Sequence, residues 1–321
     1  MPKPFGHQQA FQLKLLFGFP PFWGVRGQCA HDTATGPTTR PVWVYDTYTR
    51  TLADTFKGNR QAKDSSALDR DINRCQLPNP CPLSREHPVH LGHAMTTLQT
   101  AKIEWRDGGV PVSRQFDDPY FSIVDGLAET QHVFLGGNDL PQRFRPGFHI
   151  GELGFGTGLN LIMAWKAGVQ SGQTGPLHFT SFEAFPMSVD DMQMALSAFP
   201  QIERYATSLL EALGDGQYEI HTDTLCANVV IGDARTTVPE WSGCADAWFL
   251  DGFSPAKNPE LWDKDLLSAV ATHTNPGGSC ATYSAAGHVR RNLGDVGFVV
   301  ERVPGFGRKR HMTVGHIGTI T

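Results

Sequence analysis

Three glycines that follow an apolar segment are the residues whose spacing most directly suggests chemistry. Within the segment His149–Asn160, Gly154, Gly156 and Gly158 occur at every second position. Glycine has no Cβ, so backbone N–H groups and the N-terminus of a following helix can approach a ligand closely. The pattern predicts a strand, a tight turn and a helix around a nucleotide-like group. A tight turn without any ligand is the alternative interpretation.

The glycine spacing distinguishes two classes of nucleotide-binding protein. The dinucleotide fingerprint needs its third glycine three residues after the second, and this sequence has Leu159 at that position. Glu152 followed by the three glycines instead has the spacing of S-adenosylmethionine (SAM)-dependent methyltransferases of the Rossmann-like class. We therefore expect SAM as the cofactor, with Gly154, Gly156 and Gly158 against its methionine part. Leu159 in place of the third glycine also argues against a dehydrogenase.

Three further apolar segments each end in an acidic residue, in the order that a nucleoside site requires. Glu183 ends the second segment 25 residues after Gly158, where nucleotide-binding folds place a carboxylate that accepts hydrogen bonds from ribose hydroxyls. Asp233 ends the third segment and is expected to accept a hydrogen bond from the adenine amino group. Glu152, on the first strand, is expected to orient the SAM amino group or the glycine loop. Any one such acid alone is more often a cap or a surface carboxylate.

The fourth segment leads into the loop Asp251–Pro259, which is the candidate reaction site. In open α/β sheets, reaction sites lie at the carboxyl ends of the strands. Asp251, Phe253 and Pro255 are the candidate catalytic residues because they combine an acid with an aromatic ring and a rigid turn. The loop resembles in placement the Asp/Asn-Pro-Pro-aromatic loop of amino-methylating enzymes. A proline-rich turn without a catalytic role is the alternative.

Alternation of strands and helices predicts an α/β fold with a mostly parallel, doubly wound sheet. Strands are expected near 148–153, 177–183, 227–232, 246–251 and 279–284, with helices between them. Such alternation requires right-handed crossovers. The last two strands, 298–303 and 311–317, are joined by too short a connection for a helix and must pair antiparallel. A parallel sheet closed by a terminal antiparallel strand is typical of class I SAM-dependent methyltransferases.

Residues 95–147 are expected to form a small hairpin and helix cap before the methyltransferase core, which occupies residues 148–321. The cap contains a predicted hairpin, a turn and a helix that ends at a glycine pair. These lie at Lys102–Trp105 with Val112–Gln115, at Phe116–Ser122, and at Gly126–Leu135.

Residues 1–94 lack such patterning and are expected to be an extension outside the catalytic domain. They hold ten of the 22 prolines, and the polar stretch 58–79 is expected to be a linker or disordered. No metal site is expected, because the possible ligands match no standard zinc spacing. These are Cys75, Cys81, His87, His90 and His93. We hypothesise that translation starts near Met95, directly before the first patterned segment.

Charge is unevenly distributed along the chain. Residues 1–94 carry a net charge of +4, whereas residues 95–321 carry −9. An acidic body is not the usual footprint of a nucleic-acid binder. Basic side chains nevertheless gather near the C-terminus, where they could neutralise phosphates, and a solvated run of charges is the alternative. They include Arg290, Arg291, Arg308, Lys309 and Arg310.

Apolar runs long enough to cross a membrane are missing from the sequence. None approaches the roughly 20 residues that span a bilayer. The apolar segment 11–25 is interrupted by Lys14, Pro20 and Pro21, and no signal-peptide cleavage site follows it. We therefore expect no membrane association. The six cysteines show no disulfide-framework spacing, which suggests reduced thiols and a cytoplasmic location.

Five motifs in co-linear order resemble one family of methyltransferases. The sequence is similar to the methyltransferase half of the bifunctional tRNA 5-methylaminomethyl-2-thiouridine biosynthesis proteins (MnmC) and to their stand-alone methyltransferase relatives. The resemblance covers roughly residues 101–317 and says nothing about residues 1–94. The motifs are Phe116–Ser122, Val133–Asn138, Gly151–Asn160, Asp246–Pro259 and Gly305–Arg310.

The resemblance implies a reaction and its partners. Such enzymes transfer a methyl group from SAM to the primary amine of 5-aminomethyl-(2-thio)uridine at the tRNA wobble position, giving 5-methylaminomethyl-(2-thio)uridine. The partner is then the tRNA anticodon stem-loop. Bifunctional members add a flavin-dependent oxidase that first removes a carboxymethyl group. We expect that half and its flavin to be absent from this chain, so a separate oxidase or upstream wobble-uridine enzymes would supply the amine.

The resemblance also suggests roles for individual residues. Asp251 is expected to accept an N–H bond from the substrate amine, and burial against Phe253 and Pro255 would favour the neutral amine. Asp117, Asp118 and Tyr120 are expected either to form a lid over SAM or to cap the preceding hairpin. The predicted RNA contacts are Lys257 to the wobble phosphate and the C-terminal cations, Arg290, Arg291, Arg308, Lys309 and Arg310, to the stem-loop.

Two other functions remain compatible with the sequence. One is a SAM-dependent N-methyltransferase that acts on another amine. The other is a non-catalytic SAM- or RNA-binding remnant of a bifunctional enzyme. The intact loop from Asp251 to Pro259 argues against a remnant. A measurement of methyl transfer would distinguish a remnant from an active enzyme.

Overall fold

The computed structural model describes residues 99–106, 109–122 and 125–318 of the 321-residue chain. The expectations for residues 1–94, including the candidate metal ligands and a start near Met95, lie outside these ranges. Within them, no group of three or more His, Cys, Asp or Glu side chains could hold a metal ion. None of the helices in the described part is both long and apolar enough to span a membrane.

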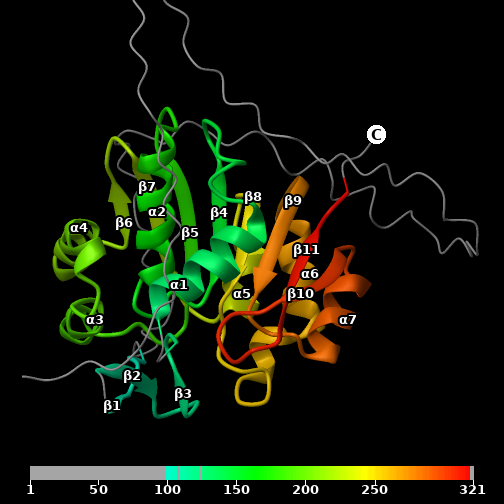
Figure 1. Ribbon diagram of the computed structural model, residues 1–321, viewed down its shortest axis with the longest axis horizontal. Coiled ribbons are helices and arrows are strands. Elements are labelled where there is room, and N and C mark those ends of the chain that lie inside the picture. Colours follow the sequence, from blue (N-terminus) through cyan, green and yellow to red (C-terminus); the bar gives the residue numbers. More distant parts are fainter. Residues whose placement is uncertain (1–98, 107–108, 123–124, 319–321) are drawn as a thin grey trace, which may run out of the picture. The chain divides into compact units, whose positions relative to one another are not determined.

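A sheet of eight strands forms the core of the described domain (Figure 1). Its order is β10-β11-β9-β8-β4-β5-β7-β6. The five strands from β9 to β7 run parallel to one another, whereas β6 pairs antiparallel with β7, and β11 pairs antiparallel with both β9 and β10. This confirms the predicted methyltransferase fold, with β11 inserted between β9 and β10. The strands are β4 (His149–Leu153), β5 (Leu177–Glu183), β6 (Glu219–His221), β7 (Leu225–Ile231), β8 (Ala245–Leu250), β9 (Thr274–Thr282), β10 (Val299–Pro304) and β11 (His311–His316).

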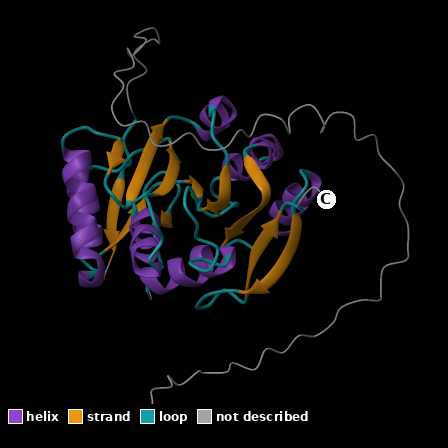
Figure 2. Ribbon diagram, turned by 90° about the horizontal axis from the view of Figure 1, so that it is seen from above, coloured by secondary structure: helices purple, strands orange, loops and turns teal. Residues whose placement is uncertain are grey.

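Helices cover both faces of this sheet (Figure 2). One buried cluster joins α2 and α4 to one face, and a second joins α5, α6 and α7 to the other. The helices are α1 (Gly126–Thr130), α2 (Leu159–Ser171), α3 (Val189–Leu196), α4 (Glu203–Gly214), α5 (Ala234–Glu240), α6 (Lys264–Thr272) and α7 (Gly287–Asp295), with short turns η3 (Gln131–Leu135), η4 (Gly136–Asn138), η5 (Pro200–Ile202) and η6 (Pro259–Trp262).

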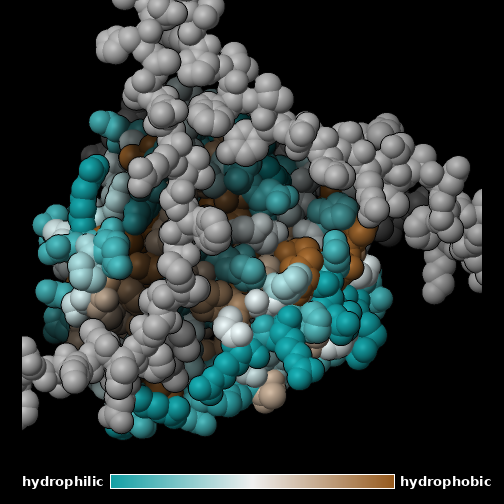
Figure 3. All heavy atoms as spheres, in the orientation of Figure 1, coloured by the Kyte–Doolittle hydropathy of each residue, from teal (hydrophilic) through white to brown (hydrophobic). Residues whose placement is uncertain are grey.

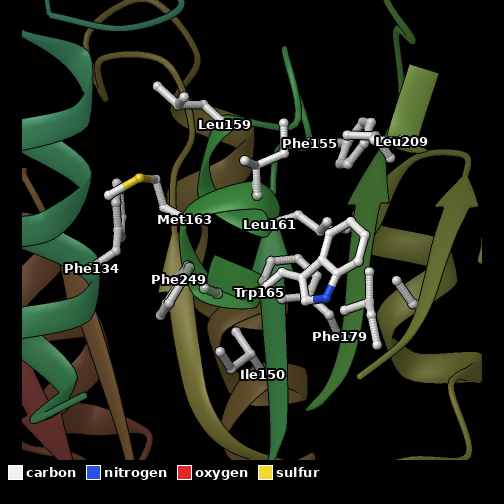
Figure 4. Close-up of a cluster of buried hydrophobic side chains, with 14 of the residues drawn as sticks. Phe134, Ile150, Phe155, Leu159, Leu161, Met163, Trp165, Phe179, Leu209 and Phe249 are labelled. Atoms are coloured by element: carbon white, nitrogen blue, oxygen red, sulfur yellow. The ribbon is translucent and has the colours of Figure 1, made fainter. Parts of the chain in front are cut away.

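Alternation along β4 and β8 divides their side chains between the two clusters. Ile150 and Phe249 lie in the cluster with α2, whereas Leu153 and Trp248 lie in the cluster with the later helices. Side chains of successive strand residues point to opposite faces, so both faces of these central strands are buried. Figure 4 shows the first cluster, in which Met163 of α2 extends toward Phe134 of η3, while Ile150 and Phe249 lie below.

The N-terminal cap contains the predicted hairpin and one strand more than predicted. β1 (Ile103–Arg106) pairs antiparallel with β2 (Val110–Ser113). The segment Phe116–Ser122, predicted as a turn, contains β3 (Asp118–Pro119), which pairs with β2. A strand of two residues has no detectable alternation, so sequence patterning missed it.

The helix predicted over Gly126–Leu135 changes type along its length. Its first part is α1, the second is the π-helical η3, and a 3-10 turn continues to Asn138. The glycine pair that was expected to end the helix lies inside this last turn. Asp139, with a φ of 55°, takes the left-handed conformation at its end instead.

Two other boundaries differ from the predictions. β6 was missed because only Ile220 of its three residues is buried. β9 begins at Thr274, earlier than the expected 279, although its first half contains Pro276 and a glycine pair that resemble a turn. The antiparallel pair of β10 and β11 is confirmed.

The first prediction concerns Gly154, whose φ is +88°. A Cβ at this position would overlap the carbonyl oxygen of Asp251, whereas Gly172, with a φ of +73°, has nothing within 4 Å. Gly172→Ala should cost only the left-handed strain, about 1 kcal/mol of the free energy of unfolding. Gly154→Ala should cost about 3 kcal/mol or more. Urea unfolding of both variants checks this, and equal losses would show that the close approach is unimportant.

Candidate active site

The carboxyl ends of the parallel strands open into one large cavity. Its volume is about 1430 Å³, more than the ~300–1,000 Å³ of an ordinary small-molecule site. The cavity can therefore hold a nucleoside-sized cofactor together with part of a second substrate. Residues from the cap, the glycine turn, the strand ends and the C-terminal loop line it, among them Tyr120, Gly156, Glu183, Asp233, Asp251 and Lys309. In Figure 3, hydrophobic residues gather over the middle of one face and hydrophilic ones surround them.

The glycines of the turn serve two different purposes. Gly154 and Gly156 line the cavity, as predicted for residues that approach SAM. Gly158, with a φ of +76°, does not line it. A Cβ there would lie 2.7 Å from the side chain of Leu209. Gly158 therefore allows the turn to pack closely on α4, a role that the spacing alone did not reveal.

Glu183 lies at the cavity wall, where a ribose-binding acid was predicted. Its carboxylate accepts hydrogen bonds from the backbone N–H groups of Gly156, at 3.0 Å, and Phe185, at 2.8 Å. Burial raises the pKa of this carboxyl, and the backbone N–H groups oppose the rise. Each carboxylate oxygen has a second lone pair, so ribose hydroxyls can still donate to it. The geometry fits the predicted cofactor.

Asp233 lines the cavity, but its oxygens already have partners. It caps α5 by accepting a bond from the Arg235 backbone N–H at 2.9 Å, and it pairs with the Arg235 guanidinium at 2.6 Å. These hydrogen bonds to Arg235 lower the pKa of the Asp233 carboxyl. The adenine contact stays a prediction, and the structure adds a capping role to it.

Glu152 is fully buried behind the cavity rather than in its lining. Its carboxylate accepts hydrogen bonds from the Ser181 hydroxyl, at 2.6 Å, and from the Asn160 amide, at 3.0 Å. Burial raises the pKa of Glu152 well above its ordinary value. Of the two roles predicted for Glu152, orientation of the loop fits this position better than contact with the SAM amino group.

Asn160 connects Glu152 to the candidate catalytic acid. The same Nδ2 group donates to Asp251 Oδ2 at 2.6 Å, and Asn160 Oδ1 accepts from the Thr130 hydroxyl at 2.8 Å. Asn160 was not among the predicted site residues, because an asparagine two residues after the last glycine resembles an ordinary helix start. The available signal was its place in an apolar run, where a buried amide needs partners.

Asp251 follows β8 and lines the cavity. Burial raises the pKa of its carboxyl to about 7 and Glu129 adds to the rise, whereas Asn160 and Lys309 lower it. A carboxyl with a pKa near neutrality can exchange a proton with a bound substrate at physiological pH. Asp251 therefore combines the position and the acidity of a proton acceptor.

Aromatic rings from the cap and from the loop Asp251–Pro259 form a wall beside Asp251. Phe253 stacks on Phe116 with ring centroids 4.7 Å apart, and Tyr120 meets Phe253 edge-on at 5.1 Å. Asp118 fastens the cap to the catalytic loop by accepting a bond from the Ser254 backbone N–H at 2.8 Å. The cap thus lies against the reaction site, an arrangement that favours the lid interpretation of Asp118 and Tyr120.

Only two of the predicted RNA contacts line the cavity. Arg308 and Lys309 line it, whereas Lys257, Arg290, Arg291 and Arg310 do not. The Lys257 ammonium pairs with Asp117 at 3.3 Å and with Asp118 at 3.6 Å. Pro255, predicted beside the amine, also lies outside the lining. The structure therefore brings Asp251 and Phe253 together at the cavity but leaves Pro255 and most of the cations around it.

Comparison with known proteins identifies the class. Residues 200–317 match the family of S-adenosyl-L-methionine-dependent methyltransferases. The solved structure of MnmC2 from Aquifex aeolicus is similar, with a TM-score of 0.55 and 28% identity over 70% of this chain and 73% of that chain. Together with the strand order and the glycine turn, these matches define the chain as a class I SAM-dependent methyltransferase.

Curated relatives define the type within this class. The tRNA 5-methylaminomethyl-2-thiouridine biosynthesis bifunctional protein MnmC of Stutzerimonas stutzeri (strain A1501) is 42% identical over 247 residues, which is 74% of this chain and 37% of that protein. MnmC of Vibrio cholerae (strain M66-2) is 42% identical over 242 residues, 70% of this chain and 36% of its own length. The chain spans little more than a third of these relatives. It is a methyltransferase of the MnmC type, as its motifs predicted.

The second prediction follows from the acidity of Asp251. Its pKa in the folded protein, about 7, exceeds the ordinary 3.8, so between these values the folded state holds a proton that the unfolded chain has lost. The free energy of unfolding should therefore fall as pH rises from 5 to 7, by at most about 1.4 kcal/mol per unit from this group. Asp251→Asn should remove this part of the slope, whereas Asp215→Asn, at the exposed end of α4, should not. Urea unfolding of the wild type and both variants across this pH range checks the prediction. Equal slopes of unfolding free energy against pH for the wild type and Asp251→Asn would contradict it.

Proposed function

We propose that this chain transfers a methyl group from SAM to the primary amine of 5-aminomethyl-(2-thio)uridine at the wobble position of tRNA. The product would be 5-methylaminomethyl-(2-thio)uridine. The observation that carries the proposal is Asp251, a half-buried acid directly after β8 that lines the cavity beside the ring of Phe253. The names of the 42% identical relatives support the nucleoside and the tRNA.

When bound, SAM supplies an electrophilic methyl group on a sulfonium. The residues of the chain have to hold an amine in line with it and leave the amine nitrogen with a free lone pair. A free alkylamine is largely protonated at neutral pH, by analogy with lysine. Asp251 is placed to accept an N–H bond from that nitrogen. The aromatic wall of Phe116, Tyr120 and Phe253 would exclude water and favour the neutral form.

The proton balance gives Asp251 a second role. An ordinary carboxylate is too weak a base to deprotonate an alkylammonium, and its charge would stabilise the ammonium. Burial raises the pKa of Asp251 to about 7, and this reduces the difference between its pKa and that of the alkylammonium. The carboxylate can then take one proton from the ammonium before transfer. The new N–C bond restores a positive charge on the product nitrogen.

Binding of the tRNA would use cations around the cavity mouth. Arg308 and Arg310 are exposed on the loop between β10 and β11, and Arg308 lines the cavity. Cations at this place could neutralise phosphates of the anticodon stem-loop while the wobble base enters the cavity. The overall acidic charge of the chain makes this local group the candidate surface.

The third prediction tests the catalytic acid. With labelled SAM and tRNA that carries the aminomethyl wobble uridine, Asp251→Ala should lower turnover by at least about 100-fold. SAM affinity should stay within a few fold, because the predicted cofactor contacts come from other residues. Asp295→Ala, an exposed acid on α7, is the matched control. A collapse of SAM affinity together with turnover would make Asp251 a cofactor ligand instead.

The fourth prediction tests the RNA surface. The double variant Arg308→Ala, Arg310→Ala should weaken tRNA binding and reduce the slope of log affinity against log salt by about 2, because two phosphate contacts are lost. Binding to nucleosides without phosphates should not change. Unaltered tRNA binding across the salt series would move the surface elsewhere.

A further inference from the structure

Lys309 is exposed, but its ammonium lies at the cavity wall against two partners. Its Nζ is 3.3 Å from Glu129 Oε1 and 3.6 Å from the centroid of the Tyr283 ring. All three residues line the cavity together with Asp251. A carboxylate and an aromatic face are the two groups that bind an alkylammonium best. Lys309 itself supplies such an ammonium.

The elements around this position hold it next to the reaction site. Glu129 and Thr130 are neighbours on α1, and Thr130 donates to Asn160, which binds Asp251. The Tyr283 hydroxyl donates to the carbonyl oxygen of Gly252, directly after Asp251, at 2.8 Å. Glu129 and Lys309 both affect the acidity of Asp251. The carboxylate, the ring and the catalytic acid therefore surround one region.

We propose that Glu129 and the face of Tyr283, with Asp251, form a subsite for the primary alkylammonium of the substrate, and that Lys309 occupies it until the substrate enters. This inference rests on the proposed function, because it names the part of the cavity that recognises the amine. Substrate and lysine present the same group, a protonated primary amine on a methylene, so the two compete for the same partners.

Exchange of the two cations fits the order of the reaction. The arriving ammonium displaces Lys309, which is free to swing toward the cavity mouth, where the phosphates of a tRNA would receive it. Glu129 and Tyr283 then hold the ammonium while Asp251 takes one of its protons. The neutral nitrogen forms the bond to the methyl carbon as the carbon–sulfur bond of SAM breaks, and the sulfur keeps the electron pair.

Equilibrium binding of two nucleosides tests the subsite without turnover and without phosphates. The probes are 5-aminomethyluridine and the uncharged 5-hydroxymethyluridine, each bound to the full chain in the presence of S-adenosylhomocysteine. The variants are Glu129→Gln, which keeps shape but removes charge, and Lys309→Met, which removes the competing ammonium. Lys264→Met is the matched control, since Lys264 pairs with Asp295 at 3.1 Å on the exposed surface.

Glu129→Gln should weaken binding of the aminomethyl nucleoside by at least about tenfold and leave the hydroxymethyl nucleoside almost unchanged. Lys309→Met should strengthen aminomethyl binding by about two- to fivefold, because the subsite is no longer partly filled. Lys264→Met should change neither. Weaker or unchanged aminomethyl binding by Lys309→Met, or equal effects of Glu129→Gln on both nucleosides, would overturn the proposal.

The same samples separate this inference from the proposed function. If wild-type protein methylates the aminomethyl wobble uridine but the variants bind the nucleosides like wild type, the subsite is wrong and the function stands. If wild-type protein binds neither nucleoside and methylates no aminomethyl tRNA, the proposed function fails and the subsite falls with it.

Discussion

The Asn160 amide is the interaction on which the site depends. One Nδ2 group donates to Glu152 on β4 and to Asp251 after β8, while Thr130 of the cap fixes the amide orientation. A buried acid without hydrogen-bond partners is costly, and this amide donates to the fully buried Glu152 and to the half-buried Asp251. Through it, the central sheet, the start of α2 and the cap are tied to the carboxyl expected to meet the substrate.

The sheet makes this contact possible because of its register. β4 and β8 are parallel neighbours with Leu153 opposite Leu250, so Gly154 and Asp251 leave the sheet side by side. The Asp251 backbone N–H donates to the Leu153 carbonyl at 3.1 Å, and Gly154 has no Cβ that would obstruct this approach. The glycine turn, which is predicted to approach SAM, therefore also positions the candidate catalytic acid, and burial raises the pKa of Asp251.

Sequence patterning predicted the parts of this arrangement that are local in the chain. These parts are the glycine turn, the acids at the ends of the strands and the antiparallel β10–β11 pair. Each is a short motif in or next to an element with a clear hydrophobic pattern. Sequence patterning could not predict groups that meet only after folding. Lys309 and Glu129 are separated by 180 positions, and Thr130 and Asn160 by 30. Lys309 was predicted as an RNA contact because basic residues near the C-terminus could neutralise phosphates, and nothing in that run of residues indicates the neighbouring carboxylate of Glu129 and ring of Tyr283. β6 was not predicted for a different reason. Only one of its three side chains is buried, so its sequence shows no hydrophobic alternation.

The central claim is that Asp251, held by Asn160, receives the amine of the substrate. The most direct test is an experimental structure of the chain with S-adenosylhomocysteine and an anticodon stem-loop that carries 5-aminomethyluridine at the wobble position. The account predicts the amine nitrogen within hydrogen-bond distance of an Asp251 oxygen, about 2.6–3.2 Å, with the Asn160 contact intact. An amine bound elsewhere, with Asp251 bonded to the cofactor or turned away from the cavity, would contradict it.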